Sequence, residues 1–66
     1  MNVRVNGKSR ALPDHCSVED LIEALGLGRR QVVVELNGSP VERSRFATLE
    51  LGSGDVIEVV RPVPGG

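Results

Sequence analysis

The chain has few of the residues that form disulfides or metal sites, which stabilise many proteins of this size. Its 66 residues include one cysteine, one histidine and one aromatic residue, with neither tryptophan nor tyrosine. A single cysteine forms no internal disulfide, and no cluster of histidine and cysteine has the spacing of a metal site. One phenylalanine provides no row of rings on which nucleic-acid bases stack. We therefore expect no metal, and apolar packing alone must hold the fold together.

Charge and hydropathy exclude two further classes of partner. Eight Lys and Arg stand against nine Asp and Glu, and the net charge is −1 without a basic run to attract nucleic acid. No apolar run approaches the ~18 residues that span a bilayer, and the N-terminus lacks the apolar segment of a signal peptide. The expectation is a cytoplasmic protein whose lone thiol stays reduced, with no nucleic-acid or membrane partner.

The first 25 residues predict a hairpin followed by a helix. Met1, Val3 and Val5 alternate with polar residues, which is the pattern of a half-buried strand. Asn6-Gly7 favours a type I′ turn, so residues 8–12 should return antiparallel to the first strand. Ser17, with an aspartate three residues later, predicts a capping box at the start of a helix. Apolar residues at helical spacing follow the cap and are expected in the core, namely Val18, Leu21, Ile22 and Leu25.

The second half of the chain predicts further strands. Residues 31–36 are rich in β-branched side chains and end at a turn cluster over residues 37–40. Residues 41–48 are polar and irregular, which indicates a brief edge strand and a loop. Residues 56–60 are apolar on both faces, as suits a central strand beside the first one. The order predicts an α+β fold in which one helix covers one face of a mixed sheet, the β-grasp topology, over residues 1–62.

A four-residue tail, residues 63–66, is expected to follow this domain. Pro62 and Pro64 favour an extended, unpaired chain, so the tail should be flexible and project from the fold. Gly65 and Gly66 have no Cβ, so their backbone can enter a narrow channel and present a carboxylate to a reagent. A frayed end is the plainer interpretation, but the fold itself does not need two terminal glycines. The combination favours a functional tail.

Three stretches of the sequence resemble a known family. These are V-V-V-E-L-N-G-S-P-V (Val32 to Val41), L-x-x-G-D-V-I-E-V-V (Leu51 to Val60) and the terminal Gly65-Gly66. They resemble the ThiS-type sulfur-carrier proteins of thiamine (thiazole) biosynthesis, which are ubiquitin-like β-grasp proteins. The resemblance covers nearly the whole chain.

The resemblance implies a group-transfer role for Gly66. In that family an ATP-dependent activating enzyme adenylates the terminal carboxylate, sulfur from a persulfide donor displaces AMP, and the resulting thiocarboxylate passes to a thiazole synthase. The carrier is not an enzyme and binds no cofactor of its own; ATP belongs to the activating enzyme. Val63, Pro64 and Gly65 are implied to thread the partners' active sites.

Other interpretations stay open at this point. The Pro62-Val63 pair also resembles the end of the small subunit of molybdopterin synthase, although Arg61 and Pro64 depart from that pattern. A ubiquitin-like protein modifier would activate the same Gly66 and form amide bonds to lysines. A plain binding module would not use the terminus.

Several residues outside the tail are candidates for lesser roles. Apolar side chains on the exposed sheet face are expected to dock partners, with Val33, Val41 and Val60 as candidates. Cys16 is expected to be a small buried hydrophobe and His15 a solvated loop residue. Two arginine pairs are candidates for a basic rim that meets an acidic partner, namely Arg29-Arg30 and Arg43/Arg45.

Overall fold

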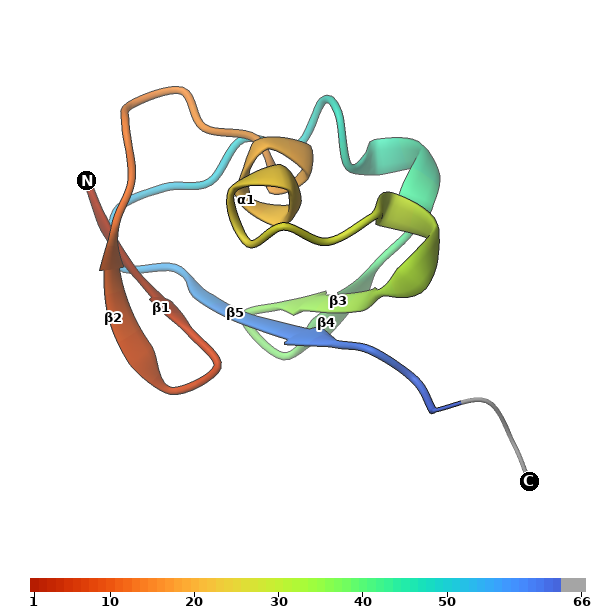
Figure 1. The fold of residues 1–66 in the computed structure, drawn as a ribbon. Coiled ribbons are helices and arrows are strands. Elements are labelled where there is room, and N and C mark those ends of the chain that lie inside the picture. The colour runs from red at the N-terminus through yellow and green to blue at the C-terminus, as the bar shows by residue number, and fades with distance from the viewer. Residues whose placement is uncertain (64–66) are drawn as a thin grey trace.

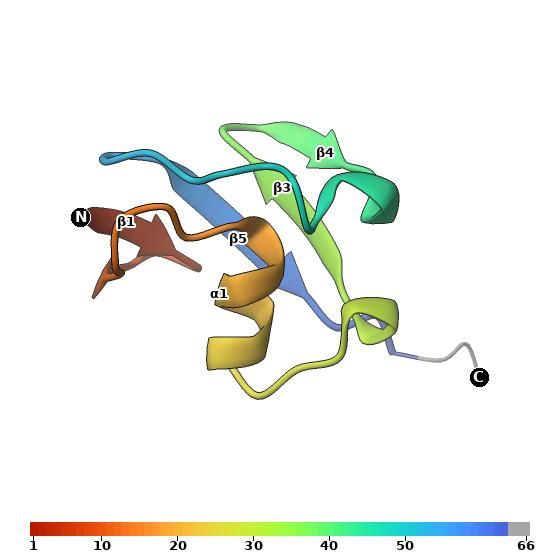
Figure 2. The same cartoon turned by 90° about the horizontal axis from the view of Figure 1, so that it is seen from above.

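The computed structural model describes residues 1–63 of the chain. Within them lie five strands and one α-helix: β1 (Asn2–Val5), β2 (Lys8–Ala11), α1 (Val18–Ala24), β3 (Val33–Leu36), β4 (Ser39–Val41) and β5 (Val56–Val60). Two short 3-10 turns, η1 (Arg29–Gln31) and η2 (Arg43–Arg45), precede β3 and follow β4. The strands form one sheet, and α1 lies across one of its faces (Figures 1 and 2).

The strand order places the last strand in the middle of the sheet. The order is β2-β1-β5-β3-β4. β1 and β5 run parallel, with Val5 opposite Ile57, whereas the other neighbours are antiparallel. Neither β1 nor β5 is an edge strand. The predicted mixed sheet with a parallel central pair is confirmed, and its topology is that of a β-grasp.

Both Asn-Gly pairs form tight hairpin turns. Asn6 and Gly7 have φ values of 51° and 83°, and Asn37 and Gly38 have values of 51° and 85°. These are the positive angles that type I′ turns require, and asparagine and glycine adopt them at little cost. The second turn is tighter than the predicted cluster over 37–40, because β4 already begins at residue 39. Its proline is accommodated since β4 is an edge strand.

The helix begins at the predicted cap. The Ser17 hydroxyl accepts a hydrogen bond from the Asp20 amide at 3.0 Å, and the Asp20 carboxylate accepts one from the Ser17 amide at 3.0 Å. The helix ends at Ala24, and Leu25, the last residue of the predicted apolar stripe, is its C-cap. Gly26 then takes the left-handed conformation at φ 75°, whereas Gly28 has an ordinary negative φ and caps η1.

The core lies between α1 and the sheet. Leu21 and Ile22 from the helix are buried, as predicted, and Phe46 fills the space beside η2. Cys16 joins this apolar core and is 3% exposed, which confirms the prediction of a small buried hydrophobe. The other buried residues are Val3, Val5, Leu12, Ser17, Val18, Val32, Val34, Leu51, Ile57 and Val59.

Candidate functional site at the end of the central strand

The central strand leads directly into the tail. β5 ends at Val60, and Arg61, Pro62 and Val63 follow it without regular secondary structure. Figure 1 shows the chain leaving the sheet at this end of β5. Val63 is 88% exposed and is therefore accessible to a partner. The remaining candidates of the tail, Pro64, Gly65 and Gly66, lie outside the described residues, so the expected flexibility and roles stay predictions.

A pair of exposed valines lies beside the base of the tail. Val33, the first residue of β3, is the direct cross-strand partner of Val60, the last residue of β5. Their side chains are 48% and 54% exposed and lie on the open face of the sheet, opposite the buried alternate residues Val34 and Val59. Two of the three candidate docking residues therefore form one small apolar patch next to the functional segment.

The third candidate, Val41, lies on the other face, so the prediction that it shares the exposed face is wrong. Val41 pairs with Val34, which is fully buried, and it packs against the core from the edge strand β4. Cross-strand partners share a face of the sheet, so the register fixes this orientation. The turn at Asn37-Gly38 sets that register, in which Leu36 pairs with Ser39 and Val34 with Val41.

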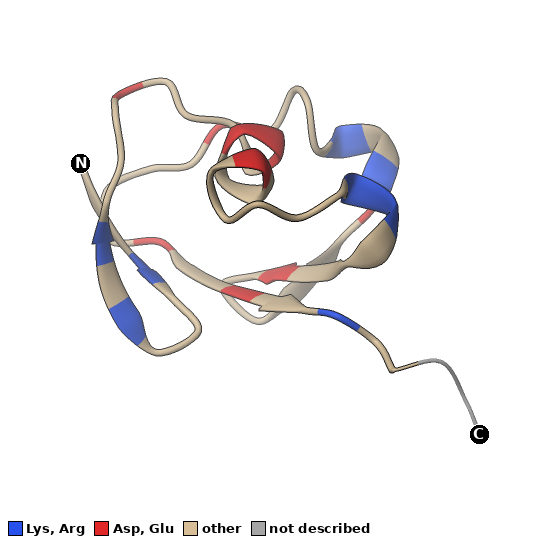
Figure 3. Cartoon of the chain, in the orientation of Figure 1, with Lys and Arg blue, Asp and Glu red and all other residues tan. Residues whose placement is uncertain are grey.

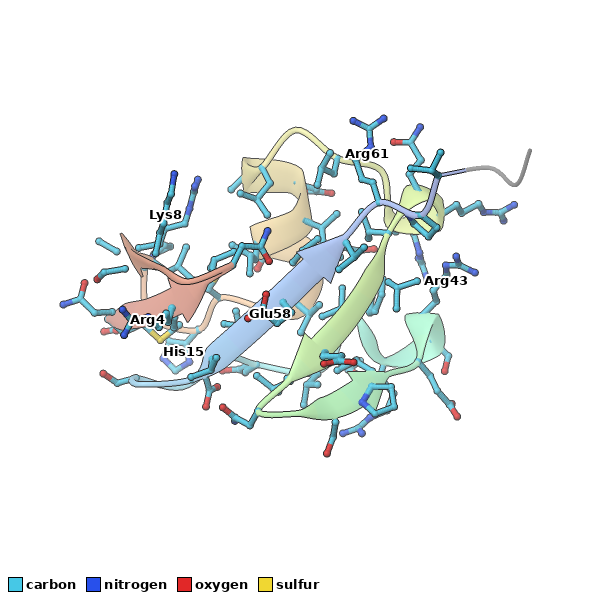
Figure 4. All side chains as sticks on the ribbon, turned by 90° about the horizontal axis from the view of Figure 1, so that it is seen from below. Arg4, Lys8, His15, Arg43, Glu58 and Arg61 are labelled. Atoms are coloured by element: carbon cyan, nitrogen blue, oxygen red, sulfur yellow. The ribbon has the colours of Figure 1, made fainter. Side chains whose placement is uncertain are left out.

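Two carboxylates also face each other on the open side of the sheet. Glu35 of β3 and Glu58 of β5 are direct cross-strand partners, and Figure 4 shows Glu58 on the open face of its strand. Like charges at this spacing destabilise a sheet. None of the ion pairs formed by residues 1–63 includes either glutamate.

Three arginines form a basic cluster at the same end of the molecule. Arg29 and Arg30 come from η1 and Arg43 from η2, and together they line a shallow surface hollow. We call these three residues the arginine cluster; Figure 3 shows the two basic turns side by side. The expected basic rim is therefore present, although Arg45, the fourth candidate, does not line the hollow.

Hydrogen bonds to backbone carbonyls hold the cluster in place. The Arg43 guanidinium donates to the carbonyl oxygens of Arg29 and Arg30 at 3.2 and 3.3 Å. In return the Arg29 guanidinium donates to the Arg43 carbonyl at 3.1 Å and forms an ion pair with Glu19 at 3.3 Å. These contacts join segments 13 and 14 residues apart, so sequence reasoning had no local pattern from which to find them.

Neither Cys16 nor His15 belongs to this end of the molecule. Burial, and then the nearby Asp20 carboxylate, raise the pKa of the Cys16 thiol, which keeps it protonated and unreactive. His15 is exposed, and its Nδ1 lies 3.2 Å from a carboxylate oxygen of Glu50. Figure 4 places His15 far from the start of the tail. Its assignment as a solvated loop residue is confirmed.

Within residues 1–63 the fold contains neither a cluster of metal ligands nor a membrane-spanning helix. No group of three or more histidine, cysteine, aspartate or glutamate side chains in this range is arranged to hold a metal ion. In the same range, no helix has the length and apolar character needed to cross a membrane. The candidate site thus consists of the tail, the valine pair at its base and the arginine cluster.

Comparison with known sequences identifies close relatives. The model of the ThiS family matches residues 3–66. The sulfur carrier protein ThiS of Bacillus subtilis (strain 168) is 34% identical over 65 residues, which are 97% of this chain and 98% of that protein. A thiazole synthase of Paramagnetospirillum magneticum is 35% identical over 66 residues, and the chain spans only 20% of its length.

Solved structures of a third relative have the same fold. The crystal structure of the thiamine biosynthesis protein ThiS from Geobacter metallireducens superposes with a TM-score of 0.85 at 35% identity, over all of both chains. An NMR structure of a thiamine biosynthesis protein from the same organism gives 0.79 at 35% identity, over this whole chain and 88% of that one. The family match, the near full-length relative and the shared fold agree, and the chain therefore belongs to the ThiS family.

Proposed function

We propose that the chain carries sulfur on its C-terminal glycine, Gly66, for thiazole formation in thiamine biosynthesis. The observation that carries this proposal is that the ThiS family match extends through residue 66 and so includes the whole tail. The B. subtilis relative, which the chain covers almost completely, is a sulfur carrier protein. The carrier acts as a co-substrate whose chemistry is performed by its partners.

The first step activates a carboxylate that is otherwise a poor electrophile. The Gly66 carboxylate attacks the α-phosphorus of ATP within an activating enzyme, pyrophosphate leaves, and an acyl-adenylate forms. The carbonyl carbon of this mixed anhydride reacts with nucleophiles far more readily than that of the carboxylate, because AMP is a good leaving group. The adjacent Gly65 presents no side chain, so the backbone can enter a narrow channel to reach the nucleotide.

The second step introduces sulfur. The terminal sulfur of a persulfide donor attacks the activated carbonyl carbon and AMP leaves, which gives an acyl disulfide. A thiol then reduces the sulfur–sulfur bond and leaves a thiocarboxylate on Gly66. This thiocarboxylate supplies sulfur to a thiazole synthase. The relation to one part of a longer thiazole synthase supports that choice of partner.

The geometry of the domain suits a carrier that serves several partners. The tail leaves the central strand β5, which pairs with β1 at Val56 and Ile57 and with β3 as far as Val60, so β3 holds the base of the tail. Pro62 donates no backbone hydrogen bond and ends the ladder there. The sheet thus holds the start of the tail, and the reacting carboxylate of Gly66 lies outside the folded domain in sequence. We propose that this exchange among enzymes takes place in the cytoplasm, where the lone cysteine stays reduced.

Reconstitution of thiazole formation tests the proposal. Purified chain, ATP, activating enzyme, persulfide donor, thiol reductant and thiazole synthase should yield thiazole in amounts that depend on the chain. Deletion of Gly66, or conversion of its carboxylate to an amide, should abolish the product. Gly65→Leu should also abolish it, whereas Gly65→Ala, the matched control with a single added methyl group, should lose less activity.

The alternatives appear as distinct outcomes of the same experiment. Activation of Gly66 followed by amide bonds to lysines would indicate a protein modifier. Sulfur delivery to molybdopterin synthase, with none to thiazole synthase, would contradict the thiamine pathway. Full thiazole formation by the chain lacking Gly66 would contradict the carrier role itself.

A further inference from the structure

The strand register places the arginine cluster against the base of the tail. Val33, two residues after the end of η1, pairs with Val60, so Arg61, the next residue along the chain, lies near η1. Figures 1 and 2 show η1 adjacent to the end of β5 from two directions. Arg61 therefore adds a fourth basic residue where the tail begins, and Figure 4 shows its side chain at this end together with that of Arg43.

This placement concentrates positive charge in a chain that is slightly acidic overall. The net charge is −1, yet the arginine cluster and Arg61 both lie at the end of the molecule from which the tail leaves. The only ion pair that these four residues make within the described part of the chain joins Arg29 to Glu19. Like charges held close together raise the local potential, and such a potential speeds association with a surface of opposite sign.

Internal packing accounts for only part of the cluster. Arg43 and Arg29 donate to each other's backbone and so tie η1 to η2. No side-chain hydrogen bond or ion pair within residues 1–63 involves the guanidinium of Arg30 or that of Arg61. Both residues are exposed. Two arginines thus fix the shape of the surface, and two present their charge to solvent.

The tail is short, so the surface at its base must come close to any partner whose active site holds Gly66. Residues 62–66 reach at most roughly 16–18 Å when fully extended. Whenever the Gly66 carboxylate lies in a partner's active site, Arg61 at the base of the tail therefore lies within that distance of it, and the surface around Arg61 faces the partner. The exposed valine pair, Val33 and Val60, lies beside the same base of the tail.

We propose that Arg30 and Arg61, supported by Arg29 and Arg43, dock on an acidic surface around the tail channel of the activating enzyme. This inference rests on the proposed function, since it needs the tail to enter that enzyme. Guanidinium groups bind carboxylates in a two-pronged geometry that lysine does not match. The contact steers the tail to its channel before the glycines engage, so it acts mainly on the rate of association.

Association kinetics with the purified activating enzyme, followed over a range of salt concentrations, test this inference. In the variant R30Q/R61Q the association rate should fall about tenfold at low salt, and its salt dependence should flatten. The control K8Q/R10Q removes the same two charges from β2, at the other side of the sheet, and should associate within about twofold of the unaltered chain. Thermal unfolding should show that both variants remain folded.

Each outcome separates this inference from the proposed function. Equal slowing by the two variants would show that net charge alone matters and would overturn the docking surface, as would wild-type kinetics for R30Q/R61Q. Slowing with thiazole synthase but not with the activating enzyme would also overturn it. The unaltered chain, tested for a sulfur-dependent mass gain, reports on the proposed function independently: a gain with no R30Q/R61Q effect contradicts the docking surface alone.

Discussion

The side-chain amide of Asn6 exchanges two hydrogen bonds with the backbone of Val59, 53 residues further along the chain. Its Nδ2 donates to the Val59 carbonyl at 3.1 Å, and its Oδ1 accepts from the Val59 amide at 2.8 Å. At the other end of the strand the Asn37 Oδ1 accepts from the Val56 amide at 2.9 Å, and the Asn37 backbone amide donates to the Val56 carbonyl at 2.8 Å. The asparagines of the two hairpin turns thus hydrogen-bond to β5, the strand that leads into the tail.

Loss of the Asn6 amide should destabilise the domain measurably. Asn6→Gly keeps the positive φ and removes both hydrogen bonds, so the free energy of unfolding should fall by about 1–3 kcal/mol. Asn6→Ala adds the strain of a left-handed alanine and should cost about 1–2 kcal/mol more. Urea titration measures both. Equal stability of Asn6→Gly and the unaltered chain would show that water replaces the two bonds without loss.

The buried face of α1 should carry much of the remaining stability. Leu21 is fully buried, and Leu21→Ala should cost about 2–5 kcal/mol by lost transfer energy and cavity formation. For a domain of this size such a loss approaches complete unfolding. Glu23→Ala, on the exposed side of the same helix, should stay within about 0.5 kcal/mol. A Leu21→Ala loss well below 1 kcal/mol would contradict the assigned core.

Much of this architecture was predictable because its determinants are local. Residue alternation located β1, Asn6-Gly7 located the first hairpin, the cluster over residues 37–40 located the second turn, and Ser17 with Asp20 located the start of the helix. The face of Val41 was predicted wrongly because it depends on the cross-strand partner: Val41 pairs with Val34, which faces the core, and the irregular pattern of residues 41–48 assigns no partner by itself. The hydrogen bonds within the arginine cluster, and those between Asn6 and Val59, join residues that are distant in the sequence. No local pattern in the sequence therefore predicts them.

The opposed carboxylates of Glu35 and Glu58 should cost the fold some stability. Glu58→Gln removes the repulsion and should raise the free energy of unfolding by about 0.2–1 kcal/mol at low salt. The gain should shrink as salt is added, since exposed charges are screened. Glu23→Gln, a removal of negative charge away from the sheet, serves as the control. Destabilisation by Glu58→Gln would show that the pair is not repulsive.

The buried thiol of Cys16 should make stability depend on alkaline pH. Its pKa is raised in the folded chain, so the folded state holds the proton more tightly than the unfolded state does. The resulting contribution is complete below about pH 8.5, the pKa of an unfolded cysteine, and is lost as the pH rises through the raised value. Denaturant titrations should therefore show a stability decline at alkaline pH that Cys16→Ala reduces. An identical decline in that variant would assign the effect to other groups.

The central claim is that Gly66 carries the transferred sulfur, and the intact mass of the chain tests it most directly. After incubation with ATP, activating enzyme, persulfide donor and thiol reductant, the mass should rise by the difference between one sulfur and one oxygen atom. Fragmentation should place that gain on Gly66, and the chain lacking Gly66 should show none. A second ThiS protein, incubated in parallel, shows that the activating enzyme is active. If the mass of the full chain then stays unchanged, or if the gain lies on a residue other than Gly66, the account is contradicted.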